Sequence, residues 1–156
     1  MDRIDLAILA ELEHEGRQPF AGLVEHVGLS RTPCWTRVQA LEHSGAIRGY
    51  HADVDPAALG LHVTAYVEVM IDPARRDAFE QAVLDHPAIV ECVTTAGDAD
   101  YLLKVLSSDV GDLDDLLRHS LTLLPGLRRS TTTISLKTIK RGASVVAATR
   151  SRTIPA

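Results

Sequence analysis

The sequence predicts an α+β chain of two domains, an N-terminal winged helix-turn-helix followed by a ferredoxin-like domain of βαββαβ order. Two observations lead to this prediction. Apolar residues recur at helical spacing over about the first 45 residues, and from Leu61 onward they alternate as in strands. The segments after Leu61 also follow the order of the ferredoxin-like motif. We expect four parts along the chain: the winged helix-turn-helix in 1–53, a linker in 54–61, the ferredoxin-like domain in 62–141, and a basic, flexible tail in 142–156.

The N-terminal domain is predicted from three helices and a glycine-containing turn. Helical spacing covers about residues 4–12, 20–26 and 30–44. Gly28 supplies the backbone freedom for a tight turn between the second and third helices. Residues 46–55 then alternate and carry a glycine midway, as a short β-hairpin or wing would. This succession is typical of a winged helix-turn-helix.

The C-terminal domain is predicted from four alternating or β-branched stretches and two amphipathic helices. In chain order these segments are 62–71 (strand), 72–87 (helix), 88–95 and 101–108 (strands), 109–126 (helix) and 127–139 (strand). Two helices on one face leave the other face of the sheet bare. That face is partly apolar, with Tyr66, Met70 and either Cys92 or Val93, so it is a candidate for self-association.

Composition and charge limit the classes of function. The formal net charge of −5 argues against a protein that coats nucleic acid indiscriminately. The balance reverses locally between Ser30 and Tyr50, where three arginines face a single glutamate, and the stretch 137–152 adds five cations and no acid. Two cysteines do not make a disulfide framework, no apolar run approaches the roughly 20 residues of a membrane span, and the N-terminus is unlike a signal peptide. A cytoplasmic location without membrane attachment is the simplest expectation.

No catalytic or metal-binding constellation is found in the sequence. Seven histidines are scattered without metal-ligand spacing, and Cys34 and Cys92 lie in different predicted domains. We therefore expect no enzymatic activity, no cofactor and no metal site.

The helix within "LSRTPCWTRVQALEHSGAI" (residues 29–47) has an inward stripe and an outward polar face. Cys34, Val38 and Leu41 point inward, so helical geometry turns the other side outward. The N-terminal part of the second helix of a helix-turn-helix meets base edges in the major groove. Arginine can read guanine, glutamine can read adenine, and threonine can bond either base or touch a thymine methyl. Arg37 and Arg48 suit phosphates better. The predicted DNA-binding set is Ser30, Arg31, Thr32, Thr36, Arg37, Gln39 and Arg48.

Two readings of this face remain open at the level of sequence. The alternative to DNA is a solvated face on a winged helix that docks on a protein. Trp35 either packs against the first helix or lies at the DNA surface, and we favour partial packing.

The loop in "TAGDADYLLKV" (residues 95–105) also has two readings. A plain hairpin explains Gly97 and one aspartate, and taken alone it is the better interpretation. Alternatively, Asp98 and Asp100 would receive an ammonium group while backbone N–H groups receive a carboxylate.

Four segments together resemble the leucine-responsive regulator family (Lrp/AsnC, or feast/famine) of bacterial and archaeal transcription factors. They are "DRIDLAILAELEHEGR", "GLSRTPCWTRVQALEHSGAIRGYHADVDPAALG", "GDADYLLKV" and "LPGLRRSTTTISLKTIK". The resemblance runs nearly from end to end. It implies a sequence-specific regulator that binds double-stranded DNA and responds to an amino acid or related small molecule.

The resemblance also implies an assembly and a ligand site. Dimers form through the open sheet faces and often assemble to octamers, with the effector bound between dimers. Ala99 departs from the aromatic residue common at its position, which leaves the pocket's size and the effector open. The implied ligand-binding residues are Gly97, Asp98, Asp100 and Tyr101 in the loop and Ser130 and Thr132 on the last strand.

Two other classes of function are alternatives to a DNA-binding regulator. The first is a small-molecule sensor whose winged helix docks on a protein partner; the outward face with Arg31 and Gln39 argues against it. The second is an enzyme of the dimeric ferredoxin-like barrel type, which the missing acid–base cluster disfavours.

Overall fold

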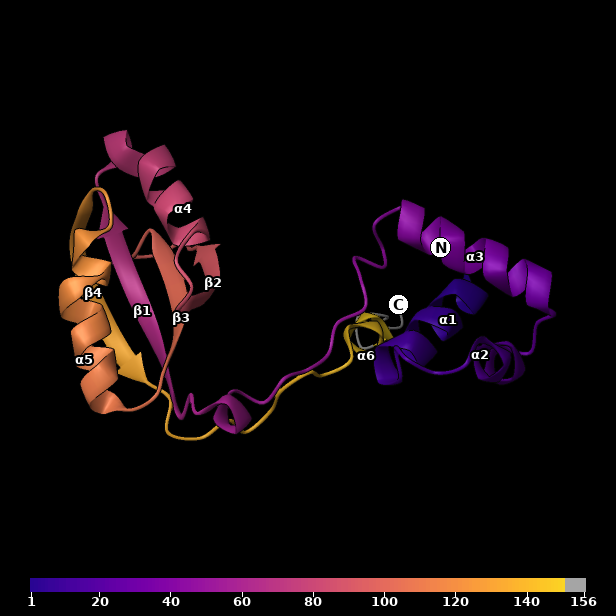
Figure 1. Ribbon diagram of the computed structural model, residues 1–156. Coiled ribbons are helices and arrows are strands. Elements are labelled where there is room, and N and C mark those ends of the chain that lie inside the picture. Colours follow the sequence, from indigo (N-terminus) through magenta and orange to yellow (C-terminus); the bar gives the residue numbers. More distant parts are fainter. Residues whose placement is uncertain (151–156) are drawn as a thin grey trace. The chain divides into compact units, whose positions relative to one another are not determined.

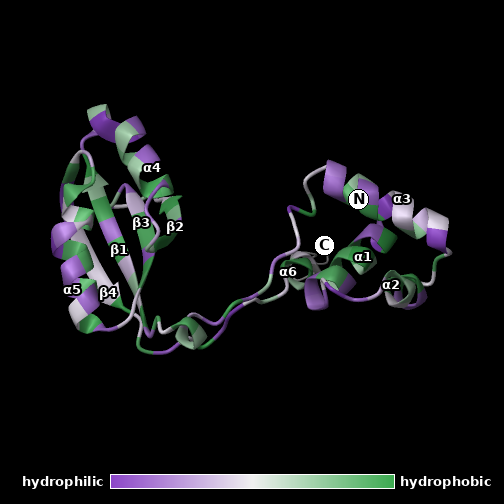
Figure 2. Ribbon diagram, in the orientation of Figure 1, coloured by the Kyte–Doolittle hydropathy of each residue, from purple (hydrophilic) through white to green (hydrophobic). Residues whose placement is uncertain are grey.

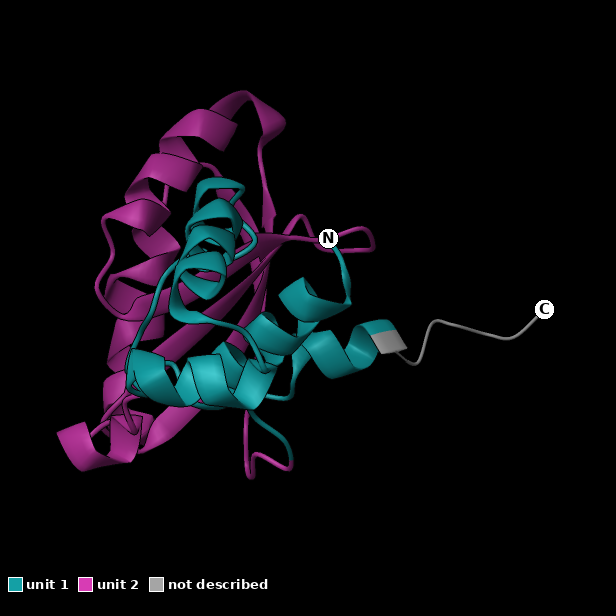
Figure 3. Cartoon of the chain, turned by 90° about the vertical axis from the view of Figure 1, so that its right-hand side faces the viewer, with its two compact units in different colours: residues 1–53, 140–156 teal, residues 54–139 magenta. Residues whose placement is uncertain are grey.

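The computed structural model describes residues 1–150, and the chain divides into two compact units. Unit 1 contains residues 1–53 together with the C-terminal stretch from residue 140, and unit 2 contains residues 54–139. The two units are shown in teal and magenta in Figure 3. Within the described chain, no helix is long and apolar enough to cross a membrane.

Unit 1 is built on three helices: α1 (Arg3–His14), α2 (Phe20–Val27) and α3 (Arg31–His43) (Figure 1). A capping box starts α1, in which the Asp2 side chain accepts from backbone N–H groups of the first turn and Asp5 accepts from the Asp2 N–H. Gly28 ends α2 at φ 67°, a left-handed conformation that favours glycine. The helix-turn-helix prediction is confirmed. The buried core of this unit is aliphatic apart from one thiol: Ile8, Leu23, Cys34, Val38 and Leu41.

The strand pair of the predicted wing is not formed in the described chain. Residues 48–55 have no regular secondary structure, and a short 3₁₀ turn follows at Pro56–Leu59. Nearly all side chains from Arg48 to Asp55 are exposed, so the alternation seen in the sequence has no apolar surface to cover. An isolated two-stranded hairpin is marginally stable at best, which accounts for the difference.

A helix occupies part of the stretch expected to be a flexible tail. α6 (Val145–Arg150) belongs to unit 1, where the carboxylate of Glu13 on α1 accepts from Ser144 Oγ at 2.6 Å and from the N–H groups of Val145 and Val146 at 2.5 and 3.3 Å. The bond from Ser144 is the main reason that the pKa of Glu13 is lowered. Val146 is buried, at 7% exposure. The expectation of a flexible tail from residue 142 is thus corrected for 145–150. The last six residues of that expectation lie outside the described chain.

Unit 2 is a four-stranded antiparallel sheet with two helices, as the ferredoxin-like prediction requires. Its strands and helices, in chain order, are β1 (Val63–Ile71), α4 (Arg76–Leu84), β2 (Ile89–Thr94), β3 (Tyr101–Ser107), α5 (Val110–His119) and β4 (Leu127–Ile134) (Figure 1). The strand order is β2-β3-β1-β4. In Figure 2, β2 and β3 are coloured as hydrophobic and the visible side of α5 is largely hydrophilic.

The sheet has one covered face and one open face. Residues at alternate positions of β1 and β3 are buried and pack with Phe79 of α4 and Leu113 of α5. The intervening residues form the open face, where Tyr66 and Met70 are each 39% exposed and Val93 is 44% exposed. Cys92 pairs with Leu103 and packs against the core. The sequence left Cys92 and Val93 as alternatives, and Val93 is the residue on the open face.

Candidate functional site

The outward face of α3 has the exposure that the sequence predicts. Ser30 is its N-cap residue, in an extended conformation, and its side chain makes no capping hydrogen bond. Thr32 and Thr36 are exposed, and Thr36 Oγ1 donates to the Thr32 carbonyl oxygen at 3.1 Å. The opposite stripe is buried at Cys34, Val38 and Leu41. Ser30, Thr32 and Thr36 therefore have polar groups available at the N-terminal half of α3.

Arg31 and Trp35 share an aromatic neighbour, Phe20 of α2. The Trp35 ring meets the Phe20 ring edge-on with 5.6 Å between centroids, yet 54% of Trp35 stays exposed. The Arg31 guanidinium lies over the Phe20 ring, 5.9 Å from its centroid. Phe20, Arg31, Thr32 and Trp35 line a notch of about 390 Å³. The expected partial packing of Trp35 is therefore present, and the ring that it meets belongs to α2.

Arg37 differs from the exposed residues of the predicted DNA-binding set because it forms ion pairs within unit 1. Its Nη1 donates to Asp2 Oδ2 and to Asp5 Oδ1, both at 2.7 Å. These two bonds, the one to Asp5 first, raise the pKa of the guanidinium. The pKa of Asp2 is lowered, first by the hydrogen bond from the backbone N–H of Asp5 and then by the bond from Arg37. Arg37 thus ties α3 to the N-terminus of α1 through its Nη1, and the two carboxylates compensate its charge before any phosphate contact.

Gln39 takes part in a network that the sequence did not indicate. Its Nε2 donates to Glu42 Oε2 at 2.8 Å, and the Tyr50 hydroxyl donates to Glu42 Oε1 at 2.9 Å. Burial first, and then the bond to Glu42, raises the pKa of Tyr50 to about 12. The only sequence signal for this network is an i,i+3 pair of amide and carboxylate on one helix. The link to Tyr50 needs the path of the segment after α3.

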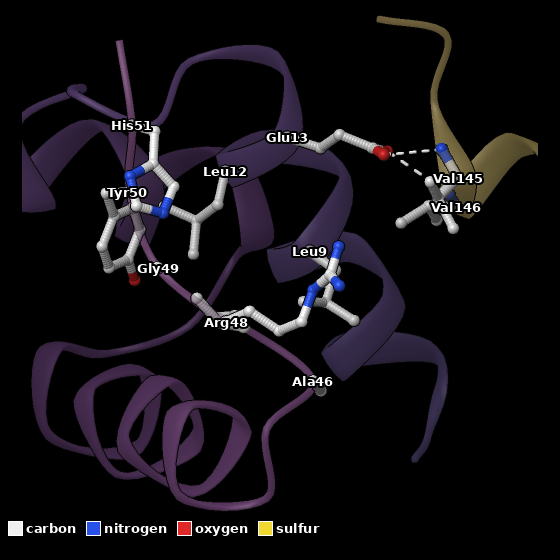
Figure 4. Close-up of a pocket in the computed structure, with 11 residues that line it drawn as sticks. Leu9, Leu12, Glu13, Ala46, Arg48, Gly49, Tyr50, His51, Val145 and Val146 are labelled. Atoms are coloured by element: carbon white, nitrogen blue, oxygen red, sulfur yellow. Dashed lines mark hydrogen bonds between the residues drawn. The ribbon is translucent and has the colours of Figure 1, made fainter. Parts of the chain in front are cut away.

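Arg48 is exposed and makes no ion pair with the described residues. It lies in a cleft of about 750 Å³ inside unit 1, and its side chain extends toward Leu9 of α1 (Figure 4). Val145 and Val146 of the α6 segment line the same cleft, next to the Glu13 carboxylate. The guanidinium of Arg48 is therefore available to an anion, as the sequence analysis expects of a phosphate contact.

The loop between β2 and β3 gives its two aspartates different environments. The N–H of Asp100 donates to the Val69 carbonyl oxygen at 2.9 Å, and Asp100 Oδ2 accepts from the Ile71 N–H at 2.9 Å. β3 begins only at Tyr101, so for the Ile71 N–H of β1 the Asp100 carboxylate takes the place of a backbone carbonyl of β3. Asp98 makes no such bond and is exposed. Asp100 is thus part of the sheet's hydrogen bonding, whereas Asp98 is free to meet a ligand.

Asp98 lies in a pocket on the open side of the sheet. The pocket has a volume of about 260 Å³ and is lined by Glu68, Met70, Asp98, Ala99, Arg129 and Thr131. It brings two carboxylates and one guanidinium together beside the C-terminal end of β1 and the N-terminal half of β4. A side chain added at Gly97 would meet no atom within 4 Å, so the glycine is not needed there for space.

Three of the expected ligand-binding residues lie on the other face of the sheet. Tyr101 is buried, packs on Phe79 at 4.8 Å between ring centroids, and donates from its hydroxyl to Glu80 Oε1 at 2.6 Å. Burial, followed by the bond to Glu80, raises the pKa of Tyr101 to about 12. Ser130 and Thr132 pair with Val69 and Val67, whose side chains face the helices.

The strand register explains why different polar residues reach the pocket. Arg129 pairs with Met70 and Thr131 pairs with Glu68, so these four side chains share the open face. Successive side chains of a strand point to opposite faces, and a shift of one residue therefore exchanges the whole set. Sequence reasoning missed Arg129 and Thr131, although their alternation with Ser130 and Thr132 was a usable signal.

Comparison with known proteins agrees with both units. Residues 1–42 match the AsnC-type helix-turn-helix domain, and residues 64–145 match the Lrp/AsnC ligand binding domain. The leucine-responsive regulatory protein of Escherichia coli is 39% identical over 153 residues, which cover 96% of this chain and 93% of that protein.

Solved structures of similar proteins include two bacterial regulators. A transcriptional regulator from Neisseria meningitidis, solved as its complex with L-methionine, is 30% identical with a TM-score of 0.86, covering 90% of this chain and 93% of that one. An AsnC family transcriptional regulator from Agrobacterium tumefaciens is 31% identical with a TM-score of 0.85, covering 93% and 96%. With its helix-turn-helix, its ferredoxin-like unit and these relatives, the chain belongs to the Lrp/AsnC family of transcriptional regulators.

Proposed function

We propose that this chain is a sequence-specific regulator that binds double-stranded DNA through α3 and changes its binding when an amino acid or a related small molecule is bound. The observation that carries the DNA part is the exposed N-terminal face of α3, where Arg31, Thr32 and Thr36 present donors and acceptors. A recognition helix reads base edges with this end in the major groove. Such a regulator works in the cytoplasm, beside the DNA it binds, and needs neither catalysis nor a cofactor.

Charge supports selective over indiscriminate binding. The chain carries −5 overall, and residues 1–60 hold five Lys/Arg against nine Asp/Glu. Arg37 is already neutralised by Asp2 and Asp5. A single copy of unit 1 therefore offers few cations to DNA phosphates and would bind DNA weakly by itself.

Pairing of chains would supply the missing affinity. The open face of unit 2 exposes Tyr66, Met70 and Val93, an apolar patch that a second copy would cover. Joining two DNA-binding units makes the second engagement effectively intramolecular and raises avidity by orders of magnitude, about 10²–10⁴. We propose a homodimer through this face, assembling further to an octamer.

The pocket at Asp98 suits a zwitterion. An amino acid carries an ammonium and a carboxylate, and each needs an opposite partner because a buried unpaired charge is costly. Asp98 and Glu68 provide carboxylates, and Arg129 provides a guanidinium that can bind a carboxylate in bidentate fashion. The relative from Neisseria meningitidis was solved with L-methionine. An effector that prefers one assembly or one placement of the DNA-binding units would shift DNA affinity by its differential binding energy.

The DNA part is tested with single-arginine variants of the full chain. Arg31→Ala should cost about 1–3 kcal/mol on selected duplexes and little on random ones, because a bidentate base contact is lost. Arg48→Ala should weaken both kinds of duplex alike and flatten the salt dependence. Arg17→Ala removes the same charge from an exposed residue of unit 1 outside α3 and is the matched control. If all three variants bind both kinds of duplex like the parent, this face does not read DNA.

A second function is favoured by one observation. Exposed Trp35 beside Phe20 and Arg31 has the composition of protein-binding hot spots, which are enriched in Trp, Tyr and Arg. The alternative is a small-molecule sensor whose helix-turn-helix docks on a protein partner. Failure of the parent chain to select any duplex from a random pool, with its amino-acid binding intact, would favour this alternative.

A further inference from the structure

The notch lined by Phe20, Arg31, Thr32 and Trp35 combines two aromatic rings with one guanidinium. The two rings meet edge-on, and Trp35 is 54% exposed. Arg31 and Trp35 are four residues apart on α3, so they are neighbours on one face of the helix. The notch therefore stands at the N-terminal end of α3, next to the donors of Arg31.

The Arg31 guanidinium of the notch can still form hydrogen bonds. The Arg31 guanidinium lies over the face of the Phe20 ring, with 5.9 Å from Cζ to the centroid. A contact of this kind with an aromatic face leaves N–H groups of the guanidinium free for a planar acceptor. It also limits the rotamers of the arginine before binding, so less side-chain entropy is lost in a contact. Arg31 is thus held ready for a bidentate acceptor such as the O6 and N7 of guanine.

The aromatic rings of Phe20 and Trp35 restrict which group of a duplex could occupy the notch. Major-groove edges present hydrogen-bond donors and acceptors, and thymine alone adds an apolar group, its C5-methyl. A donor or acceptor buried against the two rings would lose its water without a replacement bond. A methyl group gains from the same contact. The occupant that fits both parts of the notch is a thymine next to a guanine.

We propose that the notch formed by Phe20 and Trp35 reads the C5-methyl of a thymine adjacent to the guanine that Arg31 contacts. This inference rests on the proposed DNA-binding function and makes Trp35 a specificity-determining residue of it. Thr32 also lines the notch and carries a methyl and a hydroxyl group.

The test replaces thymine by deoxyuridine, which removes only the methyl group. Duplexes are first selected from a random pool with the full chain, and the thymines of the best duplex are then replaced one at a time. One position per bound copy should weaken binding about fourfold, the value of one buried methyl group. Trp35→Ala should lose that sensitivity, whereas Trp35→Phe should keep part of it.

A spectroscopic readout is independent of the affinity series. Trp35 is the single tryptophan of the chain, so its emission reports on the notch alone. We expect the emission to change when the parent binds the selected duplex, and to change less with the deoxyuridine duplex. Should Trp35→Ala lose its circular-dichroism signature of folding, the parent's deoxyuridine series and emission still decide.

The outcomes separate this inference from the function on which it rests. If the parent selects a duplex but no thymine methyl contributes, or Trp35 emission does not respond to that duplex, the inference is overturned and the notch faces a protein or solvent. If the parent selects no duplex at all, the proposed DNA-binding function fails and this inference falls with it.

Discussion

The two aspartates of the loop before β3 should separate stability from ligand response. Asp100→Ala removes the acceptor of the Ile71 N–H, and Ile71 is buried at 3% exposure. Asp98→Ala removes a carboxylate that makes no hydrogen bond to the rest of the described chain.

The expected loss of stability in Asp100→Ala follows from the kind of hydrogen bond that is removed. A hydrogen bond to a charged group contributes about 1.5–3 kcal/mol, and an unpaired buried N–H costs a similar amount. For a domain of this size, 1 kcal/mol shifts the melting temperature by roughly 4–8 °C. The lower limit of about 1.5 kcal/mol therefore predicts that Asp100→Ala melts roughly 6–12 °C below the parent. Asp98→Ala should melt with the parent.

Calorimetry measures both quantities on the full chain. Scanning calorimetry gives the melting temperatures, and titration with the twenty amino acids gives the heat of effector binding. Asp98→Ala should lose the heat that the parent gives, and Asp100→Asn, which keeps an acceptor, should recover part of the stability lost in Asp100→Ala. The reasoning fails if Asp100→Ala melts with the parent, or if Asp98→Ala binds the same amino acid with the same affinity.

Three further predictions follow from the hydrogen bonds of single side chains. The raised pKa of Tyr101, about 12 against an ordinary 10.0, favours the neutral phenol in the fold, so the stability from this group is complete below pH 10 and lost as pH rises toward 12. Denaturant titrations should show that Tyr101→Phe lacks this alkaline loss; an unchanged pH dependence would contradict it. Glu13→Ala should release α6, seen as faster hydrogen exchange at Val146 with the exchange of α3 unchanged. Because the pKa of Asp2 is lowered, its bond to Arg37 is complete at neutral pH and is lost as pH falls through that pKa, so the destabilisation by Arg37→Ala should shrink in acid below pH 3.8. A pH-independent effect would refute it.

Much of the fold was predictable because it depends on local periodicity. The stripe of Cys34, Val38 and Leu41 is a property of spacing along one helix, and the structure buries all three. The alternation in β1 likewise places Val67 and Val69 in the core. Each pattern states which side of its own element is apolar, and that information suffices for element type and burial.

The parts that were missed depend on partners far away in the chain. Arg37 bonds to Asp5 and Asp2, which precede it by 32 and 35 positions in the chain. Glu13 bonds to Val145 at a separation of 132 positions. No periodicity reports such pairs, so the sequence did not indicate the ion pairs of Arg37, and the stretch containing α6 was expected to be a flexible tail. Ser130 and Thr132 were assigned to the pocket by resemblance, whereas the register of β4 turns them to the helix-covered face.

The network around Glu42 links a segment outside α3 to Gln39, a residue that we propose to contact DNA. Glu42 holds Gln39 on one carboxylate oxygen and Tyr50 on the other. Tyr50 belongs to the segment that leaves unit 1 and continues into unit 2 at residue 54. A displacement of that segment would break the bond of Tyr50, and the freed carboxylate would accept instead from water or hold Gln39 more tightly. Because one of these bonds is exposed and the other only partly buried, each contributes about 0.5–1.5 kcal/mol, less than a buried bond to a charged group. That range overlaps the coupling of about 1–3 kcal/mol typical of regulation, so two hydrogen bonds suffice in magnitude to link the path of the chain to the availability of the Gln39 amide.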